Sequence, residues 1–373
     1  MPKSIRDELS MMAAGARLGQ AVVDPAAWLC VMEDICRAVG ATGAIMVQSD
    51  VRPTNVLYTS TLTELGRGYV RDGWHLNDPR VARYLPRLVG GEPVITDLDL
   101  FTAEEVRREP YYTEFLIPNG FRWLGVVAFR AGSDLWRLSL QRTPNEGIFT
   151  PESKPALAEL SRRLSDAATL SKAVSHAALT GCTNALNLVH LPALAIDRSG
   201  RVLDVNAAAE ATFDHELRLQ NRRLFISDQS ASIALEQFVT RMRIVSETAF
   251  VPTNPILVRR RERPPVLIRV LPIEPAARSP FLGARALLLL TDLRKTRSIA
   301  PDLLMQTFGL TRAEAKLAAL IGAGQPLEQA ANQLSIAPLT ARTQLKAVFA
   351  KTDTHRQGEL VALLSRVHSL RTG

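Results

Sequence analysis

The sequence predicts a multidomain chain in which two α+β domains with antiparallel sheets precede an all-α domain. Three observations support this prediction. A chain of 373 residues is longer than one hydrophobic core usually holds. Two stretches, 43–142 and 193–292, contain short apolar runs bounded by turn residues, as antiparallel strands do. The stretch 301–364 instead has apolar residues at helical spacing throughout.

The first domain is expected at residues 1–149. Its predicted hairpin turns at 131–133, where Gly132 can take the backbone angles of a tight turn. The elements expected before and after that turn are helices at 25–39 and 61–73, and strands at 43–48, 56–60, 121–130 and 135–142. This order fits a small sandwich of the GAF or PAS type.

Tyr69, Trp74 and Asp78 lie close together in this domain, between a predicted helix and the segment that follows. An aromatic wall with a carboxylate can hold an amphiphilic small molecule, since the rings cover apolar surface and the carboxylate accepts an amide N–H. The alternative is that both rings belong to the core and that Asp78 caps a turn before Pro79. Both interpretations stay open at this point.

A connecting helix is predicted at 150–180, where Thr150 can cap the first turn and Pro151 fits its first position. Apolar and small residues recur along it in steps of three and four: Leu157, Leu160, Leu164, Ala167, Ser171, Val174 and Ala178. Such a short heptad seam can pair two subunits or lie on the first domain. We favour pairing.

The second α+β domain is expected at 181–293. Its predicted elements are a hairpin at 193–197 and 201–205, a helix at 207–213 capped by Asn206, a helical middle, and strands at 256–260, 266–273 and 285–292. This order resembles a PAS domain. No cofactor signature is found, since His190 and His215 suit the surface better than a haem site. The arginine run 259–261 with Arg263 lies at a turn, and a solvated tip is favoured over a contact with DNA phosphate.

The last domain is expected at 294–373. Gly309 can end a helix that begins near Pro301, and Thr311 with Glu314 has the spacing of a capping box that opens the next helix. A third helix starts after Pro326, and a fourth runs from Pro338 to about residue 352. Two helices joined by the tight turn at 335–337 form a helix-turn-helix unit.

One face of the helix at 338–352 is basic, and no acidic residue lies between 337 and 352. A helix in the DNA major groove needs cationic or short polar donors and no carboxylate that repels phosphate. A solvated face is the usual explanation for a basic helix. The surrounding helix-turn-helix frame favours DNA binding here.

Residues 310–361 resemble the C-terminal domain of the LuxR-type transcriptional regulators. The resemblance rests on Leu310, Thr311, Glu314, Gly324, Ala331, Leu334, Ile336, Thr340, Arg342, Lys351, Glu359 and Leu360. It implies that Arg342, Thr343 and Lys346 approach bases, whereas Thr340 and Lys351 contact phosphates. Three positions depart from the family pattern: Ala337 replaces a capping serine, Gln344 a histidine and Asp353 a glycine. The cluster of Tyr69, Trp74 and Asp78 resembles the autoinducer-binding domains attached to many such heads.

Composition limits the partners and the compartment. The net charge of +8 favours a polyanionic partner. No opening apolar run resembles a signal peptide, and the longest apolar run, 284–290, is too short to cross a bilayer, so we expect a cytoplasmic protein without membrane contact. Cys30, Cys36 and Cys182 lack metal-ligand spacing and are interpreted as buried thiols. We expect no metal and no cofactor.

The predicted function is that of a DNA-binding transcriptional regulator with sensory domains. Double-stranded DNA with a two-fold operator, a second copy of the chain and a small-molecule effector are the expected partners, and RNA polymerase is a further candidate. No phosphate-binding loop of the P-loop type and no catalytic triad is found, so we do not expect an enzyme. The alternative is a sensory enzyme or a protein-interaction adaptor whose basic tail is incidental.

Overall fold

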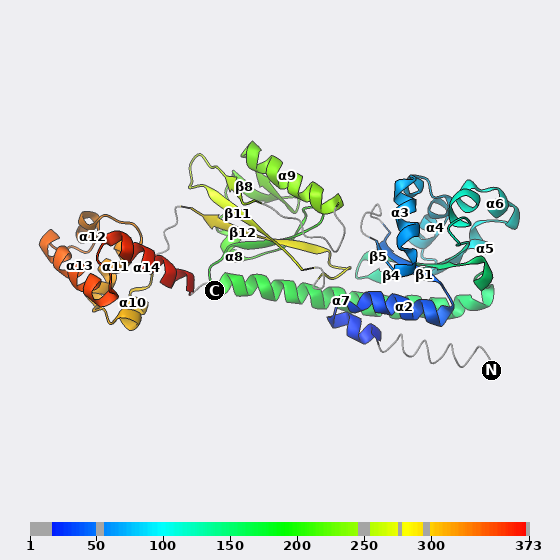
Figure 1. The fold of residues 1–373 in the computed structure, drawn as a ribbon, viewed down its shortest axis with the longest axis horizontal. Helices are drawn as coiled ribbons and strands as arrows, with labels where there is room; N and C mark the ends of the chain where they lie inside the picture. The colour runs from blue at the N-terminus through cyan, green and yellow to red at the C-terminus, as the bar shows by residue number, and fades with distance from the viewer. Residues whose placement is uncertain (1–16, 50–55, 245–253, 275–277, 294–298, 371–373) are drawn as a thin grey trace.

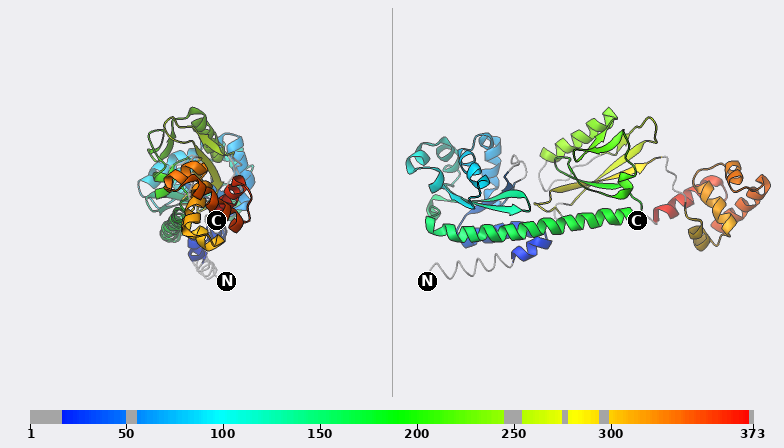
Figure 2. Two further views of the ribbon diagram at one scale, coloured as in Figure 1. Left: turned by 90° about the vertical axis from the view of Figure 1, so that its left-hand side faces the viewer. Right: turned by 180° about the vertical axis from the view of Figure 1, so that it is seen from behind.

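The computed structural model describes residues 17–49, 56–244, 254–274, 278–293 and 299–370. The chain is elongated, and three folded parts follow one another along its long axis (Figure 1). Helix α7 (Lys154–Leu188) runs beneath the first and second parts, and the C-terminal helices lie beyond its end (Figure 1, Figure 2). The expected fold class, α+β parts followed by an all-α part, is confirmed.

The first sheet is antiparallel and has the strand order β2-β1-β5-β4-β3. Its strands are β1 (Gly43–Gln48), β2 (Leu57–Tyr58), β3 (Val94–Thr96), β4 (Trp123–Ala131) and β5 (Asp134–Arg142). The predicted hairpin is confirmed, and Gly132 has a φ of 65° in its turn. The strand expected at 56–60 is shorter, because the chain turns into the 3-10 helix η1 (Ser60–Leu62).

Helices cover both faces of the first sheet. Helix α2 (Ala27–Val39) and the first half of α7 cover one face, and the core there contains Trp28, Phe129 and Trp136. The opposite core contains Tyr111, Tyr112 and Phe115. The elements over that face are α3 (Thr63–Arg71), the 3-10 helix η2 (Trp74–Leu76), α4 (Pro79–Val89), α5 (Asp97–Leu100), α6 (Ala103–Arg108) and the π-helical turn η3 (Tyr111–Leu116).

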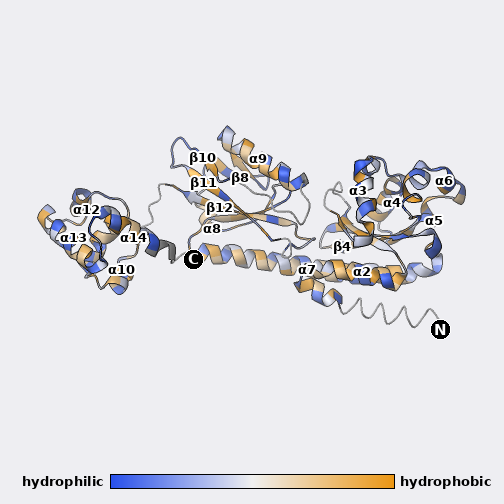
Figure 3. Cartoon of the chain, viewed as in Figure 1, coloured by the Kyte–Doolittle hydropathy of each residue, from blue (hydrophilic) through white to orange (hydrophobic). Residues whose placement is uncertain are grey.

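The predicted heptad seam of α7 is buried within the chain from Leu157 to Ser171, whereas Val174 is partly buried and Ala178 is exposed. Leu157, Leu160 and Leu164 are 2%, 2% and 1% exposed and belong to the core of the first sheet. Because these side chains already have intramolecular partners, the expectation that they pair two subunits is wrong. Hydrophobic and hydrophilic residues alternate along α7 in Figure 3, as expected for a helix with one buried face. The helix also continues past residue 180 to Leu188.

The second sheet has the order β10-β11-β12-β6-β7. When the five strands of this sheet are numbered in chain order and read from β7, the order is 2-1-5-4-3, the same as in the first sheet. Its strands are β6 (Ala193–Asp197), β7 (Val202–Val205), β10 (Ile256–Val258), β11 (Val266–Pro272) and β12 (Ala284–Asp292). As predicted, Asn206 caps helix α8 (Ala207–Glu210), and its Oδ1 accepts the N–H of Ala209 at 2.9 Å.

The segment between α8 and β10 differs from the purely helical middle that the sequence predicted. A hairpin of β8 (Leu217–Gln220) and β9 (Arg223–Ile226) precedes helix α9 (Gln229–Ile244). Asn221 and Arg222 form its two-residue turn with φ values of 51° and 57°. Positive φ at both turn positions matches the twist of a hairpin. The prediction missed it because neither position is glycine.

Arg260 is not part of a solvated basic tip. Its side chain is 1% exposed, and Nη1 lies 2.9 Å from Oδ2 of Asp214. Its Nη2 is 3.6 Å from Oδ2 of Asp292, and Nε donates to the carbonyl of Pro264 at 2.7 Å. The expected exposed turn is therefore wrong for this arginine, since a buried guanidinium with carboxylate and carbonyl partners holds the turn against the sheet.

One side chain of the second part packs into the core of the first part. Phe281 is 4% exposed, and its ring lies 4.7 Å from the ring of Trp28 and 5.0 Å from that of Trp136, both edge to face. The same ring is 6.2 Å from Phe129. Such aromatic contacts are favourable beyond the area that they bury. The first core is therefore completed by a residue from the loop before β12.

The C-terminal part is helical, with one core built from all its helices. Its elements are α10 (Pro301–Phe308), α11 (Arg312–Gly322), α12 (Leu327–Gln333), α13 (Pro338–Thr352) and α14 (Gln357–Leu370). The apolar residues Leu360, Val361, Leu364 and Val367 of α14 predict a second surface that pairs subunits, but Leu360 and Leu364 are 0% exposed in the core of the head and are not available for pairing. The side chain of Val367, which the same prediction included, lies outside the described residues.

Candidate nucleic-acid interface and ligand site

The turns of the C-terminal part place α13 at the surface. Gly309 ends α10 with a φ of 63°, and the side chains of Thr311 and Glu314 form the predicted capping box at the start of α11. Ser335 has a φ of 54° in the turn between α12 and α13. These local conformations make α12 and α13 a helix-turn-helix unit, in which the two helices pack together and Ala331 and Ala341 are buried.

Helix α13 has two distinct faces. Ala341, Leu345 and Val348 are buried in the core of the head. The opposite face is exposed and carries Leu339, Thr340, Arg342, Thr343 and Lys346. Positions 339, 342, 343 and 346 follow the three- and four-residue steps of one helix face. The structure therefore brings together four of the five residues that the sequence assigned to DNA contact.

The cations on this face are unpaired. Among the described residues, neither the guanidinium of Arg342 nor the ammonium of Lys346 forms an ion pair or hydrogen bond. The Oγ1 of Thr343 donates to the carbonyl of Leu339 at 3.0 Å, which holds its methyl group and hydroxyl in one orientation. An unpaired cation loses only its hydration when it meets a phosphate or base, so this face suits a polyanion.

Lys351 differs from the other four predicted contacts. Its Nζ donates to Oε2 of Glu314 on α11 at 2.7 Å. This hydrogen bond is the largest cause that lowers the pKa of Glu314 below its usual value. Because the ammonium already has a carboxylate partner, the geometry favours a structural role that joins α13 to α11 over the predicted phosphate contact.

The departures from the family pattern have clear structural outcomes. Ala337 stands at the N-cap of α13, and no side chain there accepts a helix N–H. Asp353 adopts the left-handed conformation, with a φ of 49°, where the family has glycine. Aspartate tolerates this conformation better than most residues with a Cβ atom.

In the first part, the structure brings Tyr69, Trp74 and Asp78 together. Asp78 caps α4, since its Oδ1 accepts the N–H of Arg80 at 2.8 Å, and its Oδ2 accepts the hydroxyl of Tyr69 at 3.1 Å. Trp74 is half-buried, with its ring 5.5 Å from Tyr111 and 5.8 Å from Phe115. The capping role that the sequence left open is therefore present, and the three side chains lie at the edge of an aromatic core.

A buried polar cluster lies beside these residues, and sequence analysis did not single it out. Arg80 is 5% exposed; Nη2 donates to the hydroxyl of Tyr111 at 2.7 Å, and Nε is 3.6 Å from Oδ1 of Asp78. Asp97 accepts the hydroxyl of Tyr112 at 2.5 Å, and burial raises the pKa of Asp97 to about 6. The sequence signal for this buried cluster was the alternation of polar and apolar residues in 135–141, together with the amphipathic segments that cover this strand.

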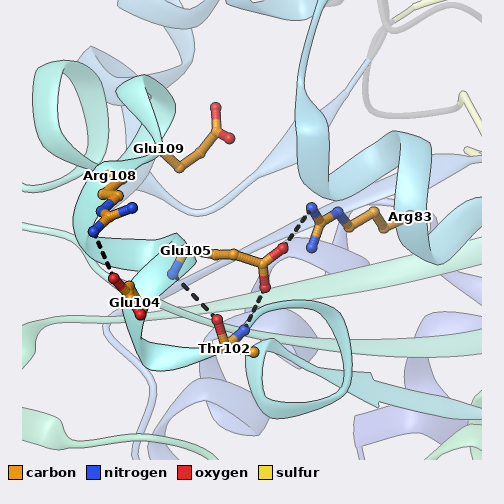
Figure 4. A pocket seen from close by; sticks show the side chains of 6 residues that line it. All are labelled: Arg83, Thr102, Glu104, Glu105, Arg108 and Glu109. Atoms are coloured by element: carbon orange, nitrogen blue, oxygen red, sulfur yellow. Dashed lines mark hydrogen bonds and ion pairs between the residues drawn. The ribbon is translucent and has the colours of Figure 1, made fainter.

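A surface hollow of 360 Å³ lies near α4 and α6, and its lining is entirely polar: Arg83, Thr102, Glu104, Glu105, Arg108 and Glu109 (Figure 4). Glu105 closes the capping box with Thr102 and forms an ion pair with Arg83 at 3.0 Å. The hydrogen bonds from Thr102 and from Arg83 lower the pKa of Glu105 to about 2. Glu104 is paired with Arg108 at 2.6 Å. With four of its five charged side chains in ion pairs and no apolar residue in its lining, this hollow lacks the features of a ligand pocket.

The described residues contain neither a cluster of metal ligands nor a membrane-spanning helix. In the described ranges, no group of three or more His, Cys, Asp or Glu side chains is arranged to hold a metal ion. Within the same ranges, none of the helices combines the length and apolarity needed to span a bilayer. Cys36 is buried, but Cys30 and Cys182 are exposed, so the interpretation of all three as buried thiols is wrong.

Comparisons with known proteins give no family. No protein-family model matches the chain, and no curated protein does. Solved structures with weak similarity include the phage VqmA–DPO complex, at 16% identity and a TM-score of 0.22, over 52% of this chain and 91% of that chain. The E. coli DhaR(N)–DhaL complex is 11% identical with a TM-score of 0.22, over 78% of this chain and 90% of that chain. At these TM-scores neither likeness identifies a fold or a function, so the functional inference rests on the geometry of α13 and of the first core.

Proposed function

We propose that this protein is a DNA-binding transcriptional regulator that reads a two-fold operator through α13. The observation that carries the proposal is the exposed face of α13, on which Arg342 and Lys346 have no partner among the described residues. No acidic side chain lies on this helix. A helix of this kind docked in the major groove donates hydrogen bonds to bases and phosphates without electrostatic repulsion.

The individual roles follow from position on the helix. Arg342, Thr343 and Lys346 point away from the head core at consecutive turns, which suits contacts to base edges. Thr340, in the first turn, suits a phosphate oxygen. Leu339 is 74% exposed, an unusual environment for leucine, and its side chain suits contact with a thymine methyl group. Lys351 supports the helix through Glu314.

The first and second parts are proposed as sensory domains of the GAF or PAS type, modulated by a small molecule. The shared strand order 2-1-5-4-3 supports this assignment. A ligand can alter DNA binding only by its different affinity for two arrangements of the chain. Phe281 and α7 offer physical links through which the first core can influence the second part.

The test is DNA binding by the full chain. Sites selected from random duplexes would be used in fluorescence anisotropy titrations at several salt concentrations. We expect the logarithm of affinity to fall with the logarithm of salt concentration, with a slope of about −0.9 for each phosphate contacted. Arg342→Ala should weaken the selected site by about 1 to 3 kcal/mol and random DNA by less.

A matched control removes the same charge elsewhere. Arg107 on α6 and Arg241 on α9 are exposed and lie outside the head. The Arg107→Ala, Arg241→Ala variant should bind like the wild type, whereas Arg342→Ala, Lys346→Ala should not. Equal affinity of all three proteins across the salt series would overturn the proposal and favour an interaction adaptor with an incidental basic tail.

A further inference from the structure

Strand β5 carries a row of polar side chains on a face that helices cover. Arg137, Ser139 and Gln141 alternate with apolar residues, a pattern that usually directs polar groups to water. Here they are only 7%, 7% and 2% exposed. The apolar alternates, Trp136, Leu138 and Leu140, belong to the core on the other face. The row is thus enclosed between the sheet and the helices, where each polar group needs a partner.

Two arginines in this enclosed layer differ in their partners. Arg80 has a counter-ion, since its Nε lies 3.6 Å from Asp78, and it donates to Tyr111. The Nε atoms of Arg80 and Arg137 are both buried without a hydrogen bond, but Arg137, unlike Arg80, forms no hydrogen bond through its other guanidinium nitrogens within the described ranges. The guanidinium of Arg137 forms no ion pair within the described ranges, and its Cζ lies 5.6 Å from the centroid of the Tyr84 ring. Burying a charge in this way is unfavourable unless an anion joins it.

The surrounding groups suit an organic anion. Tyr84 is 4% exposed, and burial raises the pKa of its phenol, so Tyr84 remains neutral and can donate a hydrogen bond. The ring of Tyr84 supplies apolar surface beside the guanidinium of Arg137, and Ser139 adds a buried hydroxyl. A site that combines apolar walls with a few polar anchors is typical of small-molecule recognition.

We propose that this enclosed layer, which we call the β5 site, binds the carboxylate of a small organic acid through Arg137. One guanidinium without a counter-ion matches the single charge of a carboxylate, which it can bind in a bidentate manner. A phosphate dianion would carry a second negative charge that the single guanidinium of Arg137 does not match. The proposal deepens the proposed function, on which it rests, by assigning the effector of the first part to a chemical class.

A distinctive consequence concerns stability without ligand. Replacing an arginine whose hydrogen bonds stabilise the fold lowers the stability of the protein. Replacing an arginine whose charge is buried without a partner does not. Arg137→Met keeps most of the volume and should melt at the same temperature as the wild type or higher. Arg142→Met is the matched control on the same strand. Arg142 donates to the carbonyls of Ile148 and Val39 and lies 3.9 Å over the ring of Phe149, so its loss should lower Tm.

The binding test uses thermal unfolding of the full chain with sodium formate, acetate, benzoate and octanoate, each compared with its amide at equal ionic strength. We expect at least one carboxylate to raise Tm by roughly 2–4 °C and its amide to leave Tm unchanged. Arg137→Met should abolish that rise, Arg137→Lys should keep part of it, and Arg142→Met should keep all of it.

Two results would overturn the β5 site: no carboxylate raises Tm above its amide, or Arg137→Met responds as the wild type does. The salt-dependent DNA titration is measured separately on the same protein. If the protein binds DNA but does not respond to a carboxylate, the proposed regulator function stands and the proposed carboxylate effector is wrong. If a carboxylate response depends on Arg137 but the protein does not bind DNA, the β5 site stands and the proposed function is wrong.

Discussion

Lys351 of α13 donates a hydrogen bond to Glu314 of α11 across 2.7 Å, and the same carboxylate accepts the backbone N–H of Thr311 at 2.8 Å. One side chain therefore caps α11 and anchors the end of the helix proposed to read DNA. Helix α13 depends on such anchors because its own N-cap, Ala337, offers no side-chain acceptor. The orientation of Arg342 and Lys346 is thus linked to an ion pair at the opposite end of the helix.

The first prediction is that Glu314→Gln and Lys351→Ala have unequal effects on stability. Lys351 is 37% exposed on its side chain, so the loss of its ion pair should cost only about 0.5 kcal/mol. Glu314→Gln weakens both the ion pair and the capping box and should cost about 1 kcal/mol. Urea unfolding of the two variants measures both values. A loss for Lys351→Ala as large as that for a fully buried ion pair would contradict the structure.

The same pair predicts a dependence on pH. The pKa of Glu314 is lower in the folded state than in the unfolded chain. Its contribution is therefore present above the unfolded pKa, which is about 4.3, and is lost as pH falls through the folded pKa. Glu314→Gln should remove this loss from the acid limb of the stability curve. Acid limbs that coincide for the wild type and the variant would rule out the assignment.

A second prediction separates the two faces of α7. Leu160 is 2% exposed in the first core, whereas Leu170 is 54% and Leu188 82% exposed. Leu160→Asp buries an unpaired charge and should unfold the first part. Leu170 and Leu188 lie five helical turns apart on one face, and a regulator that reads two half-sites needs a second copy of the chain. Leu170→Asp should therefore leave folding intact and weaken dimers in sedimentation experiments. Unchanged dimers with Leu170→Asp would place the subunit contact elsewhere.

The strands and the head could be predicted because their signals are local. Gly132 in the β4–β5 turn, Asn206 before α8 and the capping box of Thr311 each act within four residues of their own position, so the sequence displays them directly. The hairpin β8–β9 was missed because its turn takes positive φ without glycine. The full set of residues in the first core could not be predicted either, because Phe281, which is distant in the sequence, completes that core.

The candidate sites divide in the same way. The exposed face of α13 follows from helical spacing alone, so Arg342 and Lys346 were found. The partner of Lys351 lies 37 residues away, and no periodic pattern reports it. The β5 site depends on which helices cover the face that carries Arg137, a tertiary property. A strand with alternating polar and apolar residues is predicted from sequence to have one exposed face. Only the burial of Arg137 in the structure reveals the site.

A third prediction concerns Asp97, whose pKa is raised to about 6, mainly by burial. In the unfolded chain an aspartate titrates near 3.9. Because the folded state holds the proton more tightly, this group makes the protein less stable as pH rises from about 4 to 6. Asp97→Asn should remove that slope and raise Tm at pH 7. Tyr112→Phe should lower Tm instead, because the hydroxyl that Asp97 accepts is lost.

The last prediction is that Phe281 couples the unfolding of the first and second parts. Its ring fills a position between Trp28 and Trp136, so Phe281→Ala should leave a cavity in the first core. A buried phenylalanine replaced by alanine usually costs about 3–5 kcal/mol. Because the contact joins two parts of the chain, we expect the first part to melt earlier and the calorimetric trace to split.

Phe225→Ala is the matched control, since Phe225 is 37% exposed on β9 and touches Arg218 rather than the first part. That variant should lower Tm slightly and keep the shape of the trace. Intrinsic fluorescence identifies which part melts, because Trp28, Trp74, Trp123 and Trp136 all lie in the first part. If Phe281→Ala lowers the tryptophan transition no more than Phe225→Ala does, then the ring of Phe281 is not a structural member of the first core. In that case α7 is the better candidate for a link between the first and second parts.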